Sequence, residues 1–364
     1  MRAPYRVAVW GPGTIGTAAI RELLLLPETE LVGVLAYSES KKGVDAGTLV
    51  GMDPVGVPVT TSRDELIATR PEIVVHAPRD YGDFQADDDI VALLESGIDV
   101  VTVLPYQYPA IRPQDAIARL LAAAERGGAT LFGTGMNPGF QMERLAMLAT
   151  GVTNGVEQVL VAEYVDCSAM PGAGEFLSLF GFGLDGGDPE STKAVIGVVE
   201  NYQLQSLHLA AERLGVQIDR IEREDFHVDA PERIVVPDLM TIEPGTVGLV
   251  RFRWTAYCDD KPFLVLNVNW YMTDLMRPTE AEGRGEDFWL VEIRGRPSVR
   301  IELEVTASLD DDVRLHPDNP TEVSMLGVTI PAIQAIPAVV DAAPGIMVLD
   351  PPQFMWRSDL RLGR

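Results

Sequence analysis

The sequence predicts an α/β domain followed by an α+β domain whose sheet is mostly antiparallel, and three observations support this fold class. The chain has 364 residues, which is more than one ordinary core requires. Up to Phe140, continuous apolar runs alternate with segments of helical spacing, as in parallel strands joined by helices. Beyond Phe140, apolar and polar residues alternate with period two, which is typical of antiparallel strands with one wet face.

The stretch from Arg6 to Gly16 gives the first domain its expected role. An apolar run leads into the turn GPGTIG, and helical spacing continues to Leu24. In a strand, turn and helix of this kind, the first glycine forms the turn, the second lets backbone approach a pyrophosphate, and the third lets the helix pack on the strand. The helix N-terminus adds unpaired N–H groups and a partial positive charge. We therefore predict a Rossmann nucleotide-binding domain, with cofactor contacts from Gly11, Gly13, Thr14, Ile15 and Gly16.

The loop after the second expected strand, residues 30–36, indicates which nicotinamide cofactor fits. An NAD enzyme usually places an acidic residue there, whereas an NADP enzyme replaces it with small polar and basic groups. Glu39 is close enough to leave NAD as the alternative, and a solvated charged loop is a second alternative. The loop favours NADP, with its 2′-phosphate held by Ser38, Ser40, Lys41 and Lys42.

The remaining strands of the first domain are expected at residues 72–77, 99–103 and 130–132, with helices at 61–68, 89–96 and 114–126. Ligands of open α/β sheets bind just past the carboxyl ends of the strands. Cofactor contacts are therefore expected from His76, Ala77 and Pro78 after one strand, and from Asn137 in the glycine-rich turn at residues 133–140. Substrate contacts are expected from Tyr106, Gln107, Tyr108, Met136 and Phe140.

The second domain is predicted to contain strands at residues 156–165, 248–256, 263–271, 288–294 and 298–306, covered by one long helix at 191–214. A helix is expected at 141–150, and another at 329–343 with Pro331 in its first turn and a kink at Pro337. The predicted boundaries are a nucleotide domain at 1–140, completed by 325–364, and a substrate and dimerisation domain at 141–324. A homodimer through the wet face of the sheet is expected.

Composition excludes several classes of function. A net charge of −25 opposes binding to nucleic acid or to an anionic membrane. No apolar run approaches the length of a membrane span and the first residues lack a signal-peptide pattern, so a cytoplasmic location is expected. Cys167 and Cys258 have no metal-ligand spacing, and we expect reduced thiols and no metal site.

Several motifs together resemble one family. Residues 133–140, GTGMNPGF, resemble the GTGxNPGF turn of the dihydrodipicolinate-reductase-like proteins, which include 2,4-diaminopentanoate dehydrogenase and the native amine dehydrogenases. Residues 42–47, 245–248, 287–289 and 335–345 are similar to further segments of that family. The resemblance implies a Rossmann domain completed by C-terminal residues, a second domain that often forms a homodimer, and hydride transfer between NAD(P)H and a C=N or C=O carbon.

The sequence departs from that family in two respects. Dihydrodipicolinate reductase has a paired-histidine and lysine motif, whereas the four histidines of this chain are scattered, so that particular activity is not expected. Amine dehydrogenases have a glutamate in the loop after the strand at residues 99–103, and the matching position in this chain is Pro105. The resemblance therefore implies that the ammonia-activating carboxylate is absent from this loop.

A proton donor or acceptor must still accompany hydride transfer. Tyr106 is one candidate, and Glu163 and Asp166 on or after the strand at 156–165 are the others. A packing role for the tyrosine and a solvent-facing role for the carboxylates are the alternatives. The predicted function is hydride transfer between NADPH and a small apolar ketone or imine, or an amine in reverse, and a catalytically silent NADP-binding sensor or scaffold is the alternative. An apolar substrate pocket is expected to be lined by Met136, Phe140, Phe176, Phe180, Tyr202 and Trp270, with Ser168 as a further substrate contact.

Overall fold

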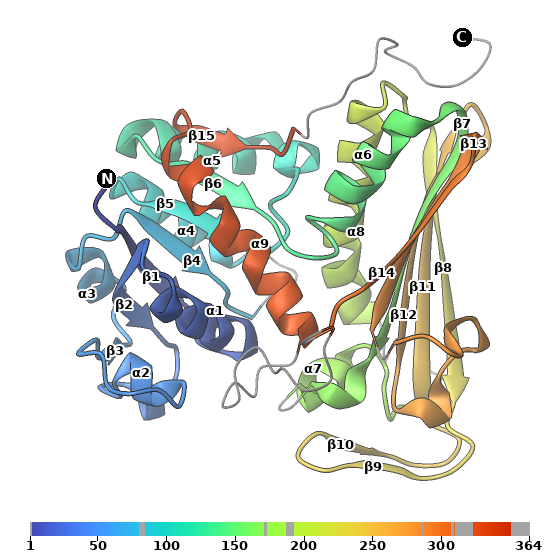
Figure 1. Ribbon diagram of the computed structural model, residues 1–364, viewed down its shortest axis with the longest axis horizontal. Coiled ribbons are helices and arrows are strands. Elements are labelled where there is room, and N and C mark those ends of the chain that lie inside the picture. The colour runs from blue at the N-terminus through green and yellow to red at the C-terminus, as the bar shows by residue number, and fades with distance from the viewer. Residues whose placement is uncertain are drawn as a thin grey trace. The chain divides into compact units, whose positions relative to one another are not determined.

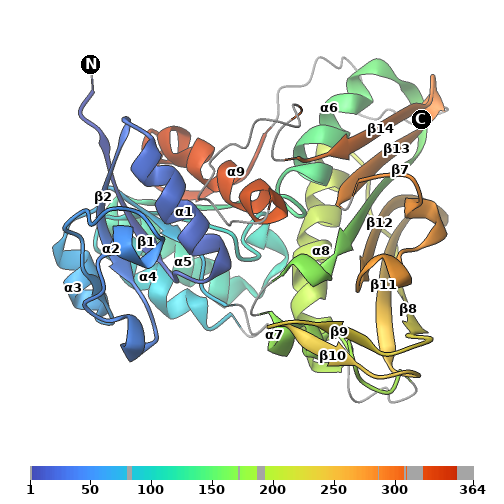
Figure 2. The same cartoon turned by 60° about the horizontal axis from the view of Figure 1, so that its bottom comes forward.

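The computed structural model describes residues 2–79, 84–170, 173–186, 193–285, 287–306, 309 and 323–350. The chain divides into two compact units, coloured by residue number in Figures 1 and 2. Unit one comprises residues 1–140 and 307–349, and unit two comprises residues 141–306 and the residues from Asp350 onward. The end of the predicted nucleotide domain, 351–364, and the first residues of the predicted long helix lie outside the described residues.

Unit one is built on a seven-stranded sheet of order β15-β6-β5-β4-β1-β2-β3 in which the paired strands are parallel. The strand order reverses at β1, since β2 and β4 flank it. Its strands are β1 (Tyr5–Trp10), β2 (Thr29–Leu35), β3 (Val59–Thr60), β4 (Ile73–His76), β5 (Asp99–Thr102), β6 (Thr130–Gly133) and β15 (Gly345–Met347).

Helices cover both faces of this sheet, as Figure 1 shows. Along β1, Val7 and Val9 pack under α1 and α9, while Ala8 and Trp10 pack under α3, α4 and α5. Continuous burial on both faces is the reason the strands read as unbroken apolar runs. The helices of unit one are α1 (Thr14–Leu25), η1 (Glu39–Lys41), α2 (Ala46–Leu49), α3 (Arg63–Ala68), α4 (Ala86–Glu95), η2 (Pro109–Ile111), α5 (Gln114–Gly127) and α9 (Val323–Val340).

The chain returns to unit one after unit two. Helix α9 packs on α1, and β15 pairs with β6 in parallel. The predicted start of α9 was wrong, because the helix begins at Val323 and both Pro331 and Pro337 lie inside it. The expected start rested on the preference of proline for the first turn of a helix. In the structure, the buried residues Ala332, Ile333 and Ile336 pack the helix onto the sheet, although each internal proline removes a backbone hydrogen bond.

Unit two contains a six-stranded sheet of order β14-β13-β7-β12-β11-β8. Only β7 and β12 pair in parallel among its described pairs, so the predicted α+β class with a mostly antiparallel sheet is confirmed. Figure 2 shows α8 lying along the sheet. The strands are β7 (Asn154–Asp166), β8 (Arg220–Asp229), β9 (Ile234–Val236), β10 (Met240–Ile242), β11 (Val247–Cys258), β12 (Lys261–Tyr271), β13 (Phe288–Arg296) and β14 (Val299–Glu304).

Two elements of unit two differ from the sequence expectation. The edge strand β8 was not predicted, because its exposed face is charged where an interior strand would be apolar. The regular helix expected at 141–150 is wrong, since this segment is a π-helix η3 (Gln141–Ala146) followed by short α and 3-10 turns. The remaining helices are α6 (Met147–Ala149), η4 (Thr150–Val152), η5 (Cys167–Ala169), α7 (Gly174–Leu179), α8 (Lys193–Arg213), η6 (Asp274–Met276) and η7 (Thr279–Ala281).

None of the helices in the described ranges is both long and apolar enough to cross a bilayer.

Candidate active site

The glycine turn after β1 has the geometry that phosphate binding requires. Gly11 has φ +87°, and a Cβ there would lie 2.7 Å from the Ala77 carbonyl oxygen. A Cβ at Gly16 would lie 2.2 Å from the Gly11 carbonyl oxygen. At Gly13, in contrast, a Cβ would meet nothing within 4 Å among the residues that the structure describes. Two glycines are therefore needed for the turn to pack on β4 and α1, while Gly13 faces open space.

The N-terminus of α1 opens onto that space. Its N-cap is Gly13, no side chain caps it, and no acidic residue lies in its first turn. The Thr17 hydroxyl donates backward to the Gly13 carbonyl at 2.8 Å. An uncapped helix N-terminus presents N–H groups and a partial positive charge to an anion. The Lys41 ammonium donates to the Pro12 carbonyl at 2.6 Å, which adds a full positive charge beside the turn.

The loop after β2 holds the residues predicted to select the cofactor. The hydroxyls of Ser38 and Ser40 are 2.6 Å apart, and both side chains are exposed. Glu39 accepts a hydrogen bond from the Thr61 hydroxyl at 2.8 Å, and this bond lowers the pKa of the carboxyl. The Lys42 ammonium lies 3.5 Å from the same carboxylate. Two serines and two lysines thus flank Glu39 in the sequence, and its carboxylate already has partners in Thr61 and Lys42.

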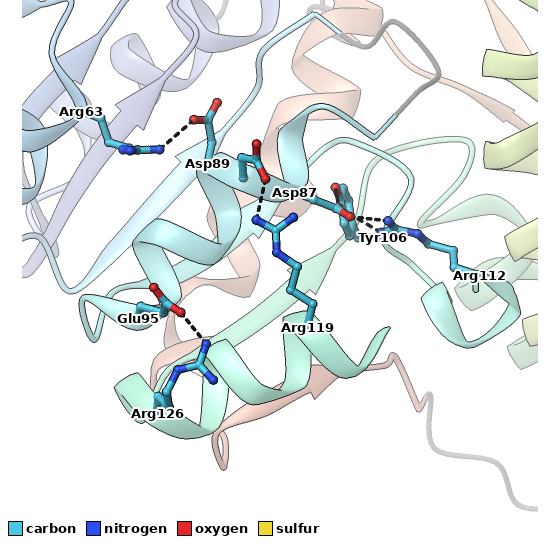
Figure 3. A network of polar contacts seen from close by, with 9 residues as sticks. Arg63, Asp87, Asp89, Glu95, Tyr106, Arg112, Arg119 and Arg126 are labelled. Carbon is cyan, nitrogen blue, oxygen red and sulfur yellow. Dashed lines mark hydrogen bonds and ion pairs between the residues drawn. The ribbon is translucent and has the colours of Figure 1, made fainter. Parts of the chain in front are cut away.

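A pocket of about 290 Å³ lies at the carboxyl ends of β1 and β2. The Trp10 indole donates to the Tyr37 hydroxyl at 2.9 Å, and that hydroxyl donates to Asp89 at 3.2 Å. Burial raises the pKa of Asp89, which also faces Arg63 at 3.6 Å (Figure 3). The pocket offers an aromatic wall and hydrogen-bonding groups to a planar polar ring. Its lining is Trp10, Leu35, Tyr37, Thr61, Ser62, Arg63, Asp64 and Asp89.

His76 is fully buried at the end of β4, where cofactor contact was predicted. The Thr102 hydroxyl donates to the His76 carbonyl at 3.1 Å, so at the 3.0 Å contact between this hydroxyl and the ring Nδ1 the ring must be the donor. Burial lowers the pKa of His76 to about 3, and the ring is therefore neutral with its proton on Nδ1. Ala77 and Pro78 follow it and bring backbone against Gly11.

Tyr106 lies within the core of unit one. Its side chain is only 1% exposed and packs under α4 and α5, and its hydroxyl donates to Asp87 at 2.5 Å (Figure 3). Burial and the neighbouring Asp87 carboxylate raise the pKa of Tyr106 far above its usual value. This environment corrects the expectation that Tyr106 supplies a proton to a substrate, because its proton is committed to a buried carboxylate and is held more tightly than in water.

The other residues predicted from unit one lie near the ends of β5 and β6. Gln107 is buried, and Tyr108 is half-buried. In the turn at 133–140, Asn137 and Phe140 are half-buried. Met136 is buried, and its Cε would lie 2.9 Å from a Cβ at Gly327 of α9. Met136 therefore packs on the helix that returns from the C-terminal part of the chain.

Glu163, a predicted catalytic residue of unit two, is a buried carboxylate held by two indoles. It lies on β7 with 6% of its surface exposed. Trp270 Nε1 on β12 donates to its Oε1 at 2.9 Å, and Trp289 Nε1 on β13 donates to its Oε2 at 3.4 Å. The solvent-facing alternative for Glu163 is excluded, since its neighbours Val161 and Val165 on the same face belong to the core under α8.

An aromatic cluster adjoins this carboxylate. The ring of Trp270 lies 4.7 Å from Phe180 and 6.2 Å from Phe176, two residues predicted to line a substrate pocket. Both Trp270 and Phe176 are half-buried, so part of the cluster reaches the surface. The structure thus brings Glu163, Phe176 and Phe180 to one face of the sheet.

Asp166 does not join Glu163. Its Oδ1 accepts the backbone N–H groups of Ser168 at 2.9 Å and Thr273 at 3.1 Å, as in a local turn. It lies three positions after Glu163 on β7, an odd offset, so the two carboxylates project from opposite faces of the sheet. Ser168 and Tyr202 are half-buried.

Sequence reasoning missed the partners that define these environments. Asp87 and Arg112 around Tyr106 lie in unremarkable helical and loop segments, and no local pattern marks them. Trp270 and Trp289 lie in predicted strands, but their shared carboxylate depends on the register of β7 with both neighbours. Within the described ranges, the acidic, histidine and cysteine side chains form no group of three or more that would hold a metal ion.

Comparisons with known proteins agree with this geometry. Residues 5–81 match the family model described as dihydrodipicolinate reductase, N-terminus. The chain is 28% identical over 352 residues to an amine dehydrogenase of Streptomyces virginiae, and the alignment covers 93% of each chain. It is 24% identical over 163 residues to the 2,4-diaminopentanoate dehydrogenase of Acetoanaerobium sticklandii, covering 43% of this chain and 44% of that relative.

The solved structure of an amine dehydrogenase from Mycobacterium smegmatis superimposes with a TM-score of 0.79 at 20% identity, covering 98% of this chain and 99% of the other. That likeness confirms the fold. Together with the glycine turn, these findings define the class: the chain is an NAD(P)-dependent oxidoreductase. More particularly, the chain is similar to dihydrodipicolinate reductase over residues 5–81 and to an amine dehydrogenase over most of its length, which confirms the resemblance predicted from its motifs.

Proposed function

We propose that the chain is an NADP-preferring oxidoreductase that transfers a hydride between the nicotinamide ring and the carbon of a small, largely apolar imine or ketone. The observation that carries the proposal is the turn at residues 11–16, where Gly13 faces open space in front of an uncapped helix. These features fit a dinucleotide, because its pyrophosphate needs close backbone N–H groups and no side chain in the way.

The loop at residues 38–42 supports the preference for NADP. A 2′-phosphate carries a charge that two serine hydroxyls and the lysine ammonium groups can hold by charge-assisted hydrogen bonds. Glu39 is engaged by Thr61 and Lys42, so its charge is partly offset at the place where it would repel the phosphate. The pocket beside Tyr37 is sized for the base at the same end of the cofactor.

Hydride transfer is the chemistry that the nicotinamide supplies when it is bound. The chain must orient the substrate and exchange one proton with its nitrogen or oxygen. We assign that exchange to Glu163, since Tyr106 is locked to Asp87 and Asp166 caps a local turn. Its two indole donors fix the carboxylate in position, and Phe176 and Phe180 beside it suit an apolar substituent.

In this proposal, Glu163 takes the role for which the amine dehydrogenases have a glutamate at the position that matches Pro105 in this chain. In amine oxidation, Glu163 takes a proton from the substrate ammonium, which leaves a neutral amine that can release hydride from its carbon. In imine reduction, it returns the proton to nitrogen. An amine or imine substrate is consistent with the relatives, whose names describe enzymes that act on amines.

The test is turnover of purified protein with NADPH or NADH and a panel of small ketones, with and without ammonia. We expect oxidation of NADPH that depends on ammonia. Glu163→Gln should lower kcat by about 10²- to 10⁴-fold, the usual contribution of an acid–base group. Glu157→Gln makes the same change at an exposed position of the same strand and should leave kcat unchanged.

Two results would contradict the proposal. Full activity of Glu163→Gln would remove the carboxylate from the mechanism. NADPH binding without turnover of any substrate would favour a silent sensor or scaffold instead.

We also propose a homodimer formed through the face of the unit-two sheet that α8 does not cover. Phe226 on the edge strand is half exposed and lies on that face, in register with Arg251 of β11 and Asn269 of β12. Light scattering during size-exclusion chromatography would measure the mass, and Phe226→Glu should shift a dimer toward monomer.

A further inference from the structure

The buried carboxylate of Asp87 binds two residues, Tyr106 and Arg112, of the segment that follows β5. Asp87, in the first turn of α4, accepts hydrogen bonds from Arg112 at 3.1 and 2.5 Å and from the Tyr106 hydroxyl at 2.5 Å (Figure 3). The Arg112 guanidinium also lies 3.7 Å from the ring centroid of Phe84. Only 5% of the Arg112 side chain and 12% of the Asp87 side chain are exposed. Asp87 thus fixes the positions of Tyr106 and Arg112 relative to each other, and Gln107 lies in the segment between them.

The amide of Gln107 is oriented by this segment. Its Nε2 donates to the Leu104 carbonyl at 3.4 Å. The reversed amide would place two oxygens together, so the contact determines which end of the amide faces Leu104. The other end, Oε1, is a buried acceptor with no hydrogen-bond partner in the described part of the chain. Gln107 is 3% exposed, so bulk water does not serve this oxygen in its place.

Thr134 provides a second buried polar atom, in the segment after β6. Its N–H donates to the Thr102 carbonyl at 2.9 Å, while its hydroxyl is buried and makes no hydrogen bond to the residues that the structure describes. A Cβ at the preceding Gly133 would lie 2.6 Å from the backbone nitrogen of Gln107, so the backbones of the two segments are in close contact. The Gln107 amide oxygen and the Thr134 hydroxyl therefore belong to two contacting segments at the carboxyl ends of β5 and β6.

Buried polar atoms without partners are rare in native proteins and indicate an unseen partner. These two lie at the same sheet edge as the glycine turn, because β1, β4, β5 and β6 are neighbouring parallel strands. A primary carboxamide offers N–H donors and a C=O acceptor side by side, which complements an amide oxygen and a hydroxyl.

We propose that Gln107 Oε1 accepts a hydrogen bond from the carboxamide N–H of the nicotinamide ring and that Thr134 Oγ1 donates one to its C=O. Asp87, Tyr106 and Arg112 are positioning residues for this contact. The inference rests on the proposed binding of a dinucleotide at residues 11–16. It assigns Gln107, predicted above to contact substrate, to the cofactor.

The experiment compares two cofactors in which only this group differs. NADPH carries the carboxamide, and its reduced 3-acetylpyridine analogue keeps the C=O but has a methyl group in place of the NH₂. Dissociation constants are measured by calorimetry for the wild-type protein, Gln107→Met and Thr134→Val. A third ligand, 2′,5′-ADP, lacks the nicotinamide and reports whether the adenosine end of the site is intact.

Wild-type protein should bind NADPH about five- to tenfold more tightly than the analogue, which is the usual effect of one neutral hydrogen bond. Gln107→Met should abolish this preference by weakening NADPH alone. Thr134→Val should weaken both cofactors equally, because both retain the C=O. Tyr106→Phe should reduce this preference partly, since it removes the hydrogen bond to Asp87 that helps to position Gln107. All variants should bind 2′,5′-ADP as the wild type does.

Gln203→Met is the matched control, because Gln203 is also 3% exposed and its Oε1 has no hydrogen-bond partner among the described residues, but it lies on α8 of unit two. It should retain the full preference for NADPH. Equal affinity of the wild-type protein for NADPH and the analogue, or an unchanged preference in Gln107→Met, would overturn the inference while leaving the proposed function intact. Absence of NADPH binding by the wild-type protein would overturn both.

Discussion

Substitution of Gly13 by alanine separates cofactor binding from folding. The residue has an extended backbone with φ −83° and ψ −154°, which does not require glycine, and an added Cβ would meet no atom of the described residues within 4 Å. Folding should therefore tolerate the methyl group. Loss of glycine's freedom in the unfolded chain should even stabilise the protein, by about 0.4–1 kcal/mol.

The same methyl group would project into the space where we place the pyrophosphate. Hydrogen bonds to a charged group contribute about 1.5–3 kcal/mol each. Displacing the phosphate from one backbone N–H should then weaken NADPH binding by about ten- to 150-fold, since each 1.4 kcal/mol is about tenfold. Calorimetric titration with NADPH measures the affinity, and urea unfolding measures the stability.

Two further variants complete the test. Gly151→Ala is the matched control, because a Cβ at Gly151 also meets nothing within 4 Å and the residue lies in unit two. Its affinity for NADPH should equal that of the wild type. Gly16→Ala should instead damage folding, since its Cβ would lie 2.2 Å from the Gly11 carbonyl oxygen. Wild-type NADPH affinity in Gly13→Ala would refute the reasoning, because no phosphate could then pass over residue 13.

Three other predictions concern charge. Asp87→Asn should destabilise the protein by about 3–5 kcal/mol in urea unfolding, because it leaves Arg112 buried without its counter-charge. The control Asp88→Asn, at an exposed ion pair, should change stability by less than about 1 kcal/mol, and equal effects of the two variants would contradict a buried ion pair at Asp87. The pKa of His76 is about 3 in the folded protein and lies below its unfolded value of 6.5, so the unfolded chain binds the proton first as the pH falls. The stability of the folded protein should therefore decrease below about pH 6.5, by at most about 1.4 kcal/mol per pH unit. His76→Gln should flatten the part of the pH dependence of urea unfolding that this residue causes, and an unchanged slope would show that the ring is not buried in its neutral form. Lys42→Ala should weaken NADPH by about tenfold and leave NADH unchanged, as fluorescence titration would show, and equal losses for both cofactors would contradict contact with a 2′-phosphate.

Local sequence chemistry predicts unit one well because its strands are buried on both faces. Val7–Trp10 and the run at residues 73–75 are apolar throughout, and glycine is required wherever the turn after β1 approaches other backbone. The edge strand β8 escapes the same reasoning, because its stability comes from pairing with β11, a partner distant in sequence, and not from its own composition.

The candidate site also contains some residues whose role the sequence predicts and others whose role it does not. Gly11, Gly13 and Gly16 act through backbone geometry within six consecutive residues, so their spacing alone indicates a phosphate site. The sequence suggests Tyr106 as an acid in the cofactor crevice, yet its hydroxyl donates to Asp87, which also accepts from Arg112 and lies 19 residues away along the chain. No periodicity encodes that contact, because it depends on how α4 packs against the loop after β5.

The sequence by itself determined the fold class, the dinucleotide turn and the likeness to an oxidoreductase family, since each depends on residue order over short distances. Tertiary structure alone decided which ionisable groups are available for chemistry. Glu163 meets the indoles of Trp270 and Trp289 only because β12 and β13 flank β7 in a particular register, and Tyr106 is withdrawn only because Asp87 is buried beside it. The protonation and accessibility of a side chain are set by neighbours brought together through folding, and those neighbours are far away in the linear sequence.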